Sequence, residues 1–471
     1  MIKNLFLIGL LIVVRANASA QSVRPNLVLM ISDDQSAANL GCYGDRLART
    51  PNLDKLARQG TRFTRAYCTS PQCSPSRATL FTGRYPHEVG ASRLAVDVLP
   101  DFLPTTLVAQ LKAQGYYTVA IGKVHQTGIP AQFDQYLPKL TLAAVTDFFA
   151  NRPKDKLNAA RPFFLWVGST DPHRPYRPGV ASPPTDPKQV AVPDYLADTP
   201  GTRQDLAWYY DAIARLDQQC GWVLDALTTA ALDPQTVVAF TSDNGLPFAR
   251  AKASLYEAGV RLPLLIRSVP TTQPDRRSGA TSDSLVSLLD LPKTLLDLVG
   301  VAAPERWKGR SLRSLLEGKP GSQPPYQFLE RNWHDTWSPA RGVVSTRYKF
   351  IVNYRPEATY LQTLDKEQAR SWQDLDSLNR LGKLRPQLAD FYFKSPRPMI
   401  ELYDLQADPG EWRNLADDPA HATVRQQMQQ ALQRWMRETG DFLPPPTMTF
   451  QTRQYESLNA TQIKPQKPPE K

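Results

Sequence analysis

The sequence predicts an α/β protein with a mostly parallel sheet flanked by helices. Short, nearly continuous apolar runs alternate with segments of helical periodicity over the first part of the chain. Such unbroken runs are typical of strands that are covered on both faces. Because helical segments separate the runs, we expect parallel strands joined by helical crossovers. The apolar runs are 26–32, 117–122, 163–168 and 236–241.

Three segments between these runs carry helix signals. Thr50 can cap a helix that begins at Pro51, and Gly60 can end it. The segment 107–114 ends on a glycine in the same way, and an apolar stripe runs along 203–229. These helices are expected to cover the sheet.

The pattern changes beyond residue 341 to that of a small α+β domain. The segments 347–354 and 401–405 alternate like strands with one exposed face, and 424–435 has the spacing of one amphipathic helix. The strands are expected to form an antiparallel sheet. The expected divisions of the chain are a signal peptide over 1–20, a large domain over 21–340, a C-terminal α+β subdomain over 341–450 and a polar tail over 451–471.

The first twenty residues have the composition of an export signal. An apolar run over 5–14 follows Lys3, and Ala18-Ser19-Ala20 has the small-residue pattern of a cleavage site. The run is too short to span a bilayer, and no later stretch predicts a transmembrane helix. We expect an exported, soluble protein. A single glycosylation sequon in the mature chain, at Asn459, favours a bacterial periplasm over a lysosome.

The formal net charge of +11 predicts attraction to polyanions. For an exported protein, a sulfated polysaccharide is a more plausible polyanion than nucleic acid. The four cysteines are too few for a disulfide framework. Cys220 has the spacing of a core residue, and the sequence leaves open whether Cys42 and Cys68 form a pair.

A polar cluster follows each of the four apolar runs. Because the carboxyl ends of parallel strands meet at one edge of a sheet, where ligands bind, the clusters are expected to converge. The side chains of Asp33, Asp34, Asp243 and Asn244 form an all-oxygen set, which suits Ca²⁺ first and Mg²⁺ second. The alternative is that Asp34 and Asp243 only cap helices. The clusters are Asp33-Asp34, Lys123 with His125, Asp171-Pro172-His173 and Asp243-Asn244.

The segment Cys73-Ser74-Pro75-Ser76-Arg77 resembles the signature of the type I sulfatases, and the resemblance continues through 66–72 and 78–84. In that family the cysteine is converted into Cα-formylglycine by a formylglycine-generating or sulfatase-maturating enzyme. One departure is Phe81, where the family usually has Leu. The family's metal motifs are matched at 24–34 and 241–245. The resemblance implies an alkaline-phosphatase-like sheet with a smaller C-terminal sheet domain.

The resemblance also implies a catalytic mechanism. One hydroxyl of the aldehyde hydrate derived from Cys73, bound to the cation, would attack sulfur. Loss of the proton from the second hydroxyl would then expel sulfate, which a serine at this position could not achieve. The implied metal ligands are Cys73, Asp33, Asp34, Asp243 and Asn244.

The other side chains of the implied site are expected around the sulfate. Lys123 and Lys252 would hold its oxygens, and His173 would protonate the leaving nitrogen or oxygen. His125 would accept the proton of the second hydroxyl, and Arg77 would hold the nucleophile. Of the remaining histidines, His334 is assigned to substrate contact, with a core position as the alternative. His87 and His421 are assigned to the surface.

Within the family, the segments 161–174, 243–248 and 401–416 are most similar to the N-sulfoglucosamine sulfohydrolases, the heparan sulfamidases. The implied substrate is a sulfated amino sugar or glycosaminoglycan fragment that loses the N-sulfate of glucosamine. Lys252 departs from the arginine that sulfamidases tend to have, so an O-sulfatase stays open. Two further alternatives are a phosphonate or phosphate ester hydrolase of the same superfamily and a non-catalytic protein that binds sulfated glycans.

Overall fold

The computed structural model describes residues 24–443, with gaps at 93–96, 153–157, 159–160, 177, 180, 270–277, 322 and 361–368. The predicted signal peptide, the polar tail and the sequon at Asn459 lie outside the described residues. Among the helices of the described part, none is long and apolar enough to cross a membrane.

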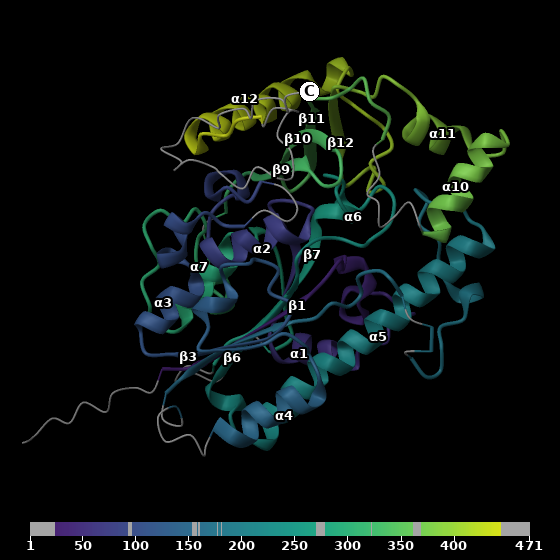
Figure 1. Ribbon diagram of the computed structural model, residues 1–471. Helices are drawn as coiled ribbons and strands as arrows, with labels where there is room; N and C mark the ends of the chain where they lie inside the picture. Colours follow the sequence, from purple (N-terminus) through teal and green to yellow (C-terminus); the bar gives the residue numbers. More distant parts are fainter. Residues whose placement is uncertain are drawn as a thin grey trace, which may run out of the picture.

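An eight-stranded sheet forms the centre of the larger part of the molecule (Figure 1). Its order is β4-β3-β5-β1-β6-β7-β2-β8, and only β7 runs antiparallel to its neighbours. The predicted mostly parallel sheet is therefore confirmed, and the four predicted runs are β1, β3, β5 and β6. The strands are β1 Asn26–Ser32, β2 Thr61–Tyr67, β3 Tyr117–Gly122, β4 Gln135–Leu137, β5 Phe163–Gly168, β6 Thr236–Ser242, β7 Arg261–Arg267 and β8 Ala280–Ser287.

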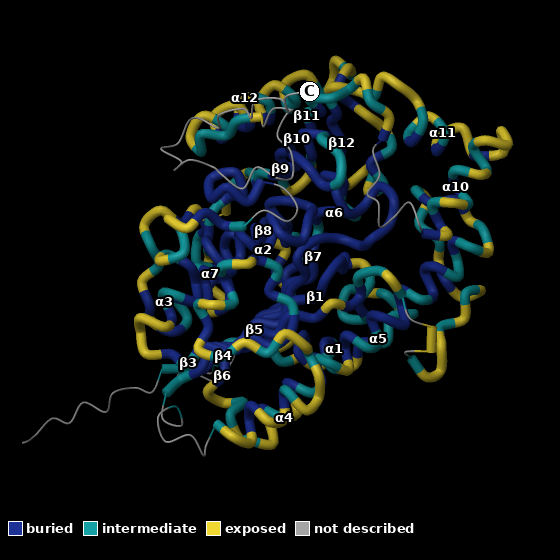
Figure 2. The backbone as a smooth tube through the Cα atoms, in the orientation of Figure 1, coloured by how far each residue is buried: buried dark blue, intermediate teal, exposed yellow. Residues whose placement is uncertain are grey.

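Helices cover both faces of this sheet, because alternate strand residues are apolar on both sides (Figures 1 and 2). Leu29 of β1 belongs to the core under α2, α3 and α7, and Met30 belongs to the core under α1, α4 and α5. Cys220 lies in the second core, as predicted. The helices are α1 Pro51–Gln59, α2 Cys73–Thr82, α3 Leu107–Ala113, α4 Leu142–Asn151, α5 Pro200–Thr229, α6 Glu257–Val260, α7 Asp290–Leu298 and α8 Arg313–Leu316.

Thr50 does not act as predicted. Helix α1 begins at Pro51, but the Thr50 side chain makes no capping hydrogen bond. Its hydroxyl instead accepts a hydrogen bond from the Gly41 N–H at 2.9 Å and donates to Asp54 at 3.2 Å. Thr50 therefore joins the preceding loop to the helix, a contact that local spacing does not reveal.

A second, antiparallel sheet of four strands has the order β12-β11-β10-β9 and lies at the top of Figure 1. Helix α12 packs on it through Met428, Leu432 and Trp435, which confirms the predicted amphipathic helix. The sheet takes β9 from before residue 341, the expected start of the small domain. The elements are β9 Gln327–Trp333, β10 Trp337–Val344, β11 Tyr348–Asn353, β12 Ile400–Asp404, α10 Arg370–Arg380, α11 Pro386–Phe393 and α12 Ala422–Thr439.

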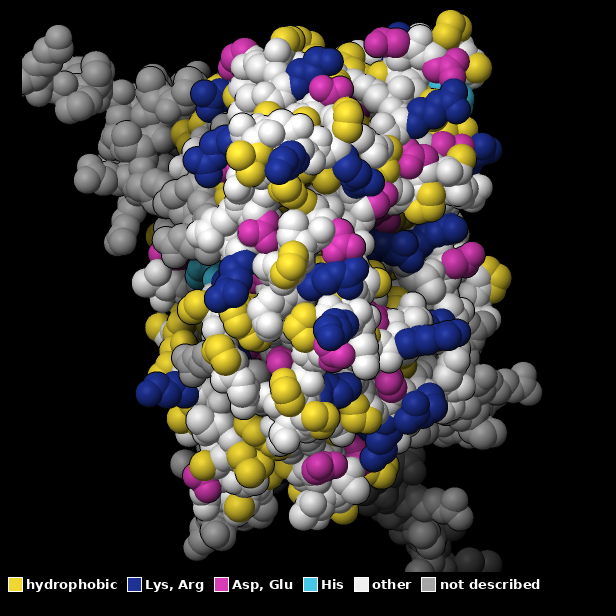
Figure 3. All heavy atoms as spheres, turned by 90° about the vertical axis from the view of Figure 1, so that its right-hand side faces the viewer, with side chains coloured by type: hydrophobic (Ala, Val, Ile, Leu, Met, Phe, Trp, Pro, Cys, Tyr) yellow, Lys and Arg dark blue, Asp and Glu magenta, His cyan; other side chains and the backbone are white. Residues whose placement is uncertain are grey.

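The excess positive charge does not form one patch on the face that α5, α10 and α11 present. Lys and Arg side chains there are interspersed with Asp and Glu (Figure 3). The described cysteines are all free, so Cys42 and Cys68 do not form a disulfide in this structure.

The expected surface position of His87 is wrong. Its side chain is only 2% exposed. His87 Nδ1 contacts Glu330 of β9 and lies 4.0 Å from Asp441 Oδ1, beyond α12. Arg341 of β10 binds Asp441 through two nitrogens at 2.5 and 2.8 Å. The cluster joins the loop after α2 to the small sheet. These partners are remote in sequence, so no local sequence pattern predicts the contacts between them. His421, near Asp418, is partly exposed.

This cluster predicts a stability that falls as pH rises. Burial disfavours the His87 imidazolium, but the facing Glu330 and Asp441 outweigh burial and raise the pKa of His87 above its ordinary value. A raised pKa stabilises the folded state below the unfolded-state pKa of about 6.5, and this contribution is lost as pH rises through the folded-state pKa. A tenfold difference in proton affinity between the two states corresponds to about 1.4 kcal/mol of free energy of unfolding.

The measurement is the melting temperature between mildly acidic and alkaline pH. His87→Gln is expected to be less stable than the native chain at acidic pH, with the difference shrinking at alkaline pH. His421→Gln, which changes a partly exposed histidine, is the matched control. A constant difference between His87→Gln and the native chain across this range would contradict the prediction.

Candidate active site

Two adjacent parallel strands bring the acidic residues together. β1 and β6 pair in register up to their last residues, so the side chains that follow them emerge at the same edge. Asp33, Asp34, Asp243 and Asn244 are all buried there. The Asp34 N–H donates to Asp243 Oδ1 at 3.1 Å, and Asn244 Nδ2 donates to Asp34 Oδ1 at 2.7 Å. The four side chains predicted to converge are thus in one cluster.

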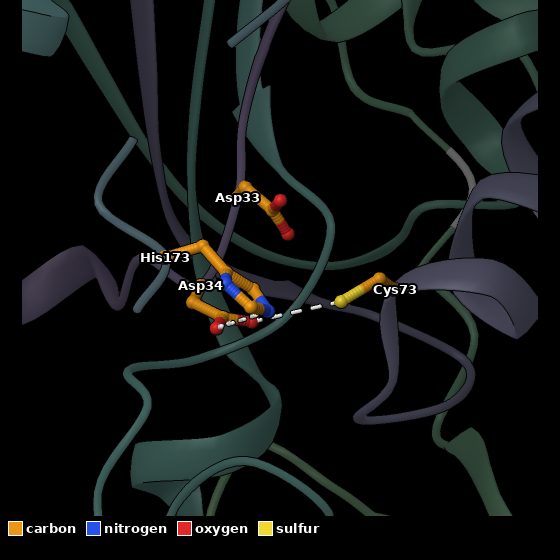
Figure 4. A group of neighbouring side chains, drawn as sticks. All are labelled: Asp33, Asp34, Cys73 and His173. Carbon is orange, nitrogen blue, oxygen red and sulfur yellow. Dashed lines mark hydrogen bonds and ion pairs between the residues drawn. The ribbon is translucent and has the colours of Figure 1, made fainter. Parts of the chain in front are cut away.

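Cys73 faces this cluster from the first position of α2. Its Sγ lies 3.7 Å from Asp34 Oδ1, and Figure 4 shows it directed toward Asp34 and His173 from the opposite side of the site. Potential ligand atoms of Asp33, Asp34, Cys73 and His173 lie within 4.8 Å of one another. Burial raises the pKa of the Cys73 thiol well above its ordinary value. The encoded thiol is therefore neutral and a poor nucleophile.

The donor set fits a divalent cation. Asp33 Oδ1 and Asn244 Oδ1 are buried without a hydrogen-bond partner, which costs free energy unless another ligand satisfies them. Burial and the neighbouring Asp33 raise the pKa of Asp243 to about 6. A cation would favour the ionised form of this carboxylate, and carboxylate and amide oxygens are the ligands that hard cations prefer.

Three cationic side chains contact the carboxylates of the cluster. Lys123, which follows β3, contacts Asp33. Lys252 Nζ lies 2.9 Å from Asp34 Oδ2, and Arg77 Nε on α2 lies 2.8 Å from Asp243 Oδ2. The three positive charges already balance the three aspartates. A divalent cation would therefore leave the site with a net positive charge that attracts an anionic substrate.

Two histidines follow strands at the same edge. His173, after β5, places Nε2 3.7 Å from Asp34 Oδ2, while its Nδ1 contacts the Arg174 carbonyl oxygen. Since a carbonyl can only accept, Nδ1 carries a hydrogen and Nε2 is the nitrogen available toward the cluster. Burial and the nearby Lys123 lower the pKa of His125 to about 3. His125 is therefore neutral.

The structure places His334 directly after β9, near the beginning of α2. The preceding Trp333 carbonyl accepts a hydrogen bond from Gln72 at 2.5 Å, and Gln72 immediately precedes Cys73. His334 is only 5% exposed, and its Nδ1 lies 2.8 Å from Asp335 Oδ2. Its assignment to substrate binding stays a prediction.

The sequence did not predict Gln126, which supports the beginning of α2. Gln126 Nε2 donates to the Ser74 carbonyl at 2.7 Å and to its hydroxyl at 2.8 Å. A glutamine in a loop carries no sequence signal of this kind, because the contact depends on how β3 and α2 pack. It fixes the residue next to Cys73.

Arg250 is a second supporting residue that the sequence did not predict. Its guanidinium lies 4.4, 4.6 and 4.1 Å from the ring centres of Tyr256, Phe391 and Trp412. It also donates to the Gly410 carbonyl at 2.6 Å. Phe391, Trp412 and Gly410 follow the first strands of the small sheet in the chain. The C-terminal region therefore holds the loop that carries Lys252.

An enzyme that displaces an anionic group needs a place for a cation, positive side chains and a proton donor together, and this sheet edge provides all three. The fold and the site therefore define a hydrolase that acts on an anionic ester or amide group. The chain belongs to the Sulfatase family, whose model matches residues 25–301, and acts as a hydrolase of sulfuric esters or sulfamates. A second model, described as N-sulphoglucosamine sulphohydrolase, C-terminal, matches residues 250–377.

Individual relatives differ in the activities that their names state. The chain is 32% identical to the N-sulphoglucosamine sulphohydrolase of Homo sapiens, over 89% of this chain and 91% of that protein. It is 28% identical to an ulvan-active sulfatase of Formosa agariphila, over 89% and 76% of the two chains. The fold is also similar to the phosphonate monoester hydrolase of Agrobacterium radiobacter, with a TM-score of 0.65, 19% identity and coverage of 88% and 96%. The fold alone therefore does not select the substrate.

Proposed function

We propose that this chain is an exported, formylglycine-dependent sulfatase that removes the N-sulfate of glucosamine from a glycosaminoglycan fragment. The observation that supports this choice of substrate is the similarity to the human N-sulphoglucosamine sulphohydrolase along nearly the whole of both chains. The match of residues 250–377 to the C-terminal model of that enzyme supports the same choice. The proposal includes Ca²⁺ rather than Mg²⁺ as the cation, maturation of Cys73 by a formylglycine-generating or sulfatase-maturating enzyme, and a periplasmic location.

The proposed site would hold the cation with Asp33, Asp34, Asp243, Asn244 and the modified residue 73. Formylglycine hydrate beside a divalent cation supplies a hydroxyl nucleophile with a lowered pKa. Arg77, one helical turn after position 73, keeps Asp243 ionised and in place. Gln126 fixes the adjacent backbone, so that the nucleophile approaches sulfur in a defined orientation.

Lys123 and Lys252 bind the sulfate oxygens in this proposal. Both ammonium groups now contact aspartates at the edge of the cluster, so a bound cation would free part of their charge for an anion. They stabilise the charge that shifts onto the sulfate oxygens and leaving atom during transfer. Lys123 directly follows β3, and Lys252 lies in the loop between β6 and α6.

The two histidines divide the proton transfers. His173 presents Nε2 to the cluster and donates its proton to the leaving nitrogen when the imidazole is charged. His125 is kept neutral by its surroundings and accepts a proton from the nucleophile side of the site. The two roles require opposite protonation states, so a bell-shaped dependence of kcat/KM on pH is expected.

A second candidate function is hydrolysis of an O-sulfate from a sulfated sugar. Lys252 favours it, because sulfamidases tend to have arginine at this position. The ammonium of lysine is a point charge, whereas the guanidinium of an arginine binds two oxygens in a fork, so the two residues would hold a sulfate group differently. The Lys252 ammonium binds one carboxylate oxygen, Asp34 Oδ2, at 2.9 Å.

The experiment compares kcat/KM of the matured enzyme on N-sulfated glucosamine, 6-O-sulfated glucosamine, an aryl sulfate and a phosphonate monoester. The proposal expects the N-sulfated sugar to be the best of the four. A higher value for the 6-O-sulfated sugar would replace it with the O-sulfatase, and a higher value for the phosphonate would replace it with a phosphonate hydrolase. Binding of the sugars without hydrolysis of any substrate would point to the glycan-binding alternative.

A further inference from the structure

A cavity of about 920 Å³ opens beside the acidic cluster and continues well beyond it. Its lining includes Asp33, assigned to the cation, and Lys123, His125 and His173, assigned to catalysis. Its lining also includes Tyr136 of β4 and residues 138–141, which follow that strand. This volume lies near the top of the range of about 300–1,000 Å³ for small-molecule sites and exceeds what one sulfated sugar fills.

The segment 136–141 is held close to the catalytic residues by the sheet. β4 is the edge strand and pairs with β3, whose last residue precedes Lys123. A Cβ atom added to Gly122, at the end of β3, would lie 3.2 Å from Leu140 Cβ. The part of the cavity that residues 138–141 line therefore lies beside the end of β3, next to Lys123, rather than on a separate surface.

Lys139 differs from the other cations of this cavity. Arg174 binds Asp205 at 2.6 and 2.8 Å, Arg215 binds Asp171 at 2.6 Å, and Lys123 contacts Asp33. Lys139 is exposed, and no ion pair joins it to any of the described residues. Its charge is thus available to a ligand in the cavity.

Tyr136 supplies a second feature of the lining of the same cavity. It is 37% exposed, one of few large hydrophobic side chains with this much exposure in the described part of the chain. An exposed aromatic ring in a cavity provides a flat apolar surface with a polar tip. A pyranose ring has an apolar face of matching shape, with hydroxyl groups around its edge.

We propose that Tyr136 and Lys139 form a subsite for the sugar attached to the one that loses sulfate, and that this neighbouring sugar is anionic. The tyrosine ring packs on the sugar face, and the lysine ammonium pairs with a carboxylate or a sulfate on that sugar. The inference rests on the proposed function and narrows its substrate to an oligosaccharide of at least two units. Lys139 and Tyr136 do not contact the reacting group, so they change selectivity rather than the chemical step.

The test begins with binding to a Cys73→Ala variant, which removes turnover from the measurement. Three N-sulfated disaccharides are compared, with a uronate, an O-sulfated neutral sugar or an uncharged sugar as the neighbour. The anionic neighbours are expected to bind about fivefold more tightly than the uncharged one, as for a partly exposed ion pair. The uronate and O-sulfate disaccharides distinguish the two sources of the negative charge.

Lys139→Gln in this background is expected to bind all three disaccharides with the affinity of the uncharged one. Tyr136→Ala is expected to weaken the binding of all three, and Tyr136→Phe to retain it. Lys383→Gln removes an exposed lysine from the loop before α11 and serves as the charge-matched control. Equal affinities for charged and uncharged neighbours in the Cys73→Ala protein, or a Lys139→Gln variant that keeps the difference, would overturn the proposal.

Activity assays in the otherwise native enzyme separate this inference from the proposed function. Lys139→Gln is expected to lower kcat/KM about fivefold on the anionic disaccharides and to leave the N-sulfated monosaccharide unchanged. An equal loss on the monosaccharide would show a role at the reacting sugar and would contradict the subsite. If the native enzyme preferred O-sulfated sugars, the proposed function would fail, while the binding comparison would still decide the subsite.

Discussion

Replacing Cys73 with serine is expected to lower steady-state turnover of any sulfate substrate by at least about 10⁴-fold, because the variant loses the regenerating nucleophile. A serine offers one hydroxyl, so a serine that accepts sulfate has no second hydroxyl through which to expel it. The fold should persist, since Cys73 occupies the first position of α2 and serine has nearly its size. The measurements are kcat on an aryl sulfate and the melting temperature.

The native protein supplies the control for this prediction. The peptide that contains residue 73 is expected to have the mass of the aldehyde rather than of the encoded thiol when the chain is produced with its maturating enzyme. Protein that keeps the thiol should be as inactive as the serine variant, because burial holds the Cys73 thiol neutral. Multiple turnovers by the serine variant, or full activity of the thiol form, would contradict the proposed nucleophile.

Asp243→Asn is expected to lower kcat about 10³-fold and to weaken cation binding, because it removes one negative charge from the cluster. Asp243 accepts hydrogen bonds from the Asp34 and Asn244 N–H groups at 3.1 and 2.8 Å and from Arg77 at 2.8 Å. The substitution keeps the shape of the side chain but leaves Arg77 without its carboxylate. Loss of one partner of a buried pair costs about 3 kcal/mol of the free energy of unfolding.

Calcium titration measured by melting temperature and by activity tests this expectation. The native protein should lose activity and stability in a chelator and regain both with Ca²⁺, whereas Asp243→Asn should need a much higher Ca²⁺ concentration. Asp217→Asn is the matched control, because Asp217 is buried but binds the backbone N–H groups that begin α1 instead of the cluster. A chelator-insensitive native enzyme would argue against the cation.

The sequence predicted the strand ends of this site well, and the reason is local. The apolar runs that precede Asp33, Lys123, Asp171 and Asp243 are buried on both faces, so their pattern marks the strands and their parallel order brings the ends together. The short motif around Cys73 marked, in the same manner, a residue that lies 3.7 Å from the acidic cluster. Both depend on residues that are adjacent in the chain.

The supporting contacts were not predictable, because each joins distant segments. His87 has the surroundings of a loop residue in the sequence, yet it meets Glu330 and Asp441 in the core. Gln126 and Arg250 likewise acquire their roles from packing against α2 and α11. Lys139 was not predictable either. That its charge is available to a ligand is evident only when the ion-pair partners of the other cations in the cavity are known.

The three aromatic rings that surround Arg250 have a consequence for where the chain can be truncated. Two of these three rings, those of Phe391 and Trp412, come after the last strand of the large sheet in the sequence. The β11 side chain Lys349 adds ion pairs of 2.8 and 2.9 Å to Glu257 and Glu411 beside it. A product terminated before these residues would retain every residue of the acidic cluster but lose the anchorage of the loop that carries Lys252. The two sheets therefore constitute a single catalytic unit.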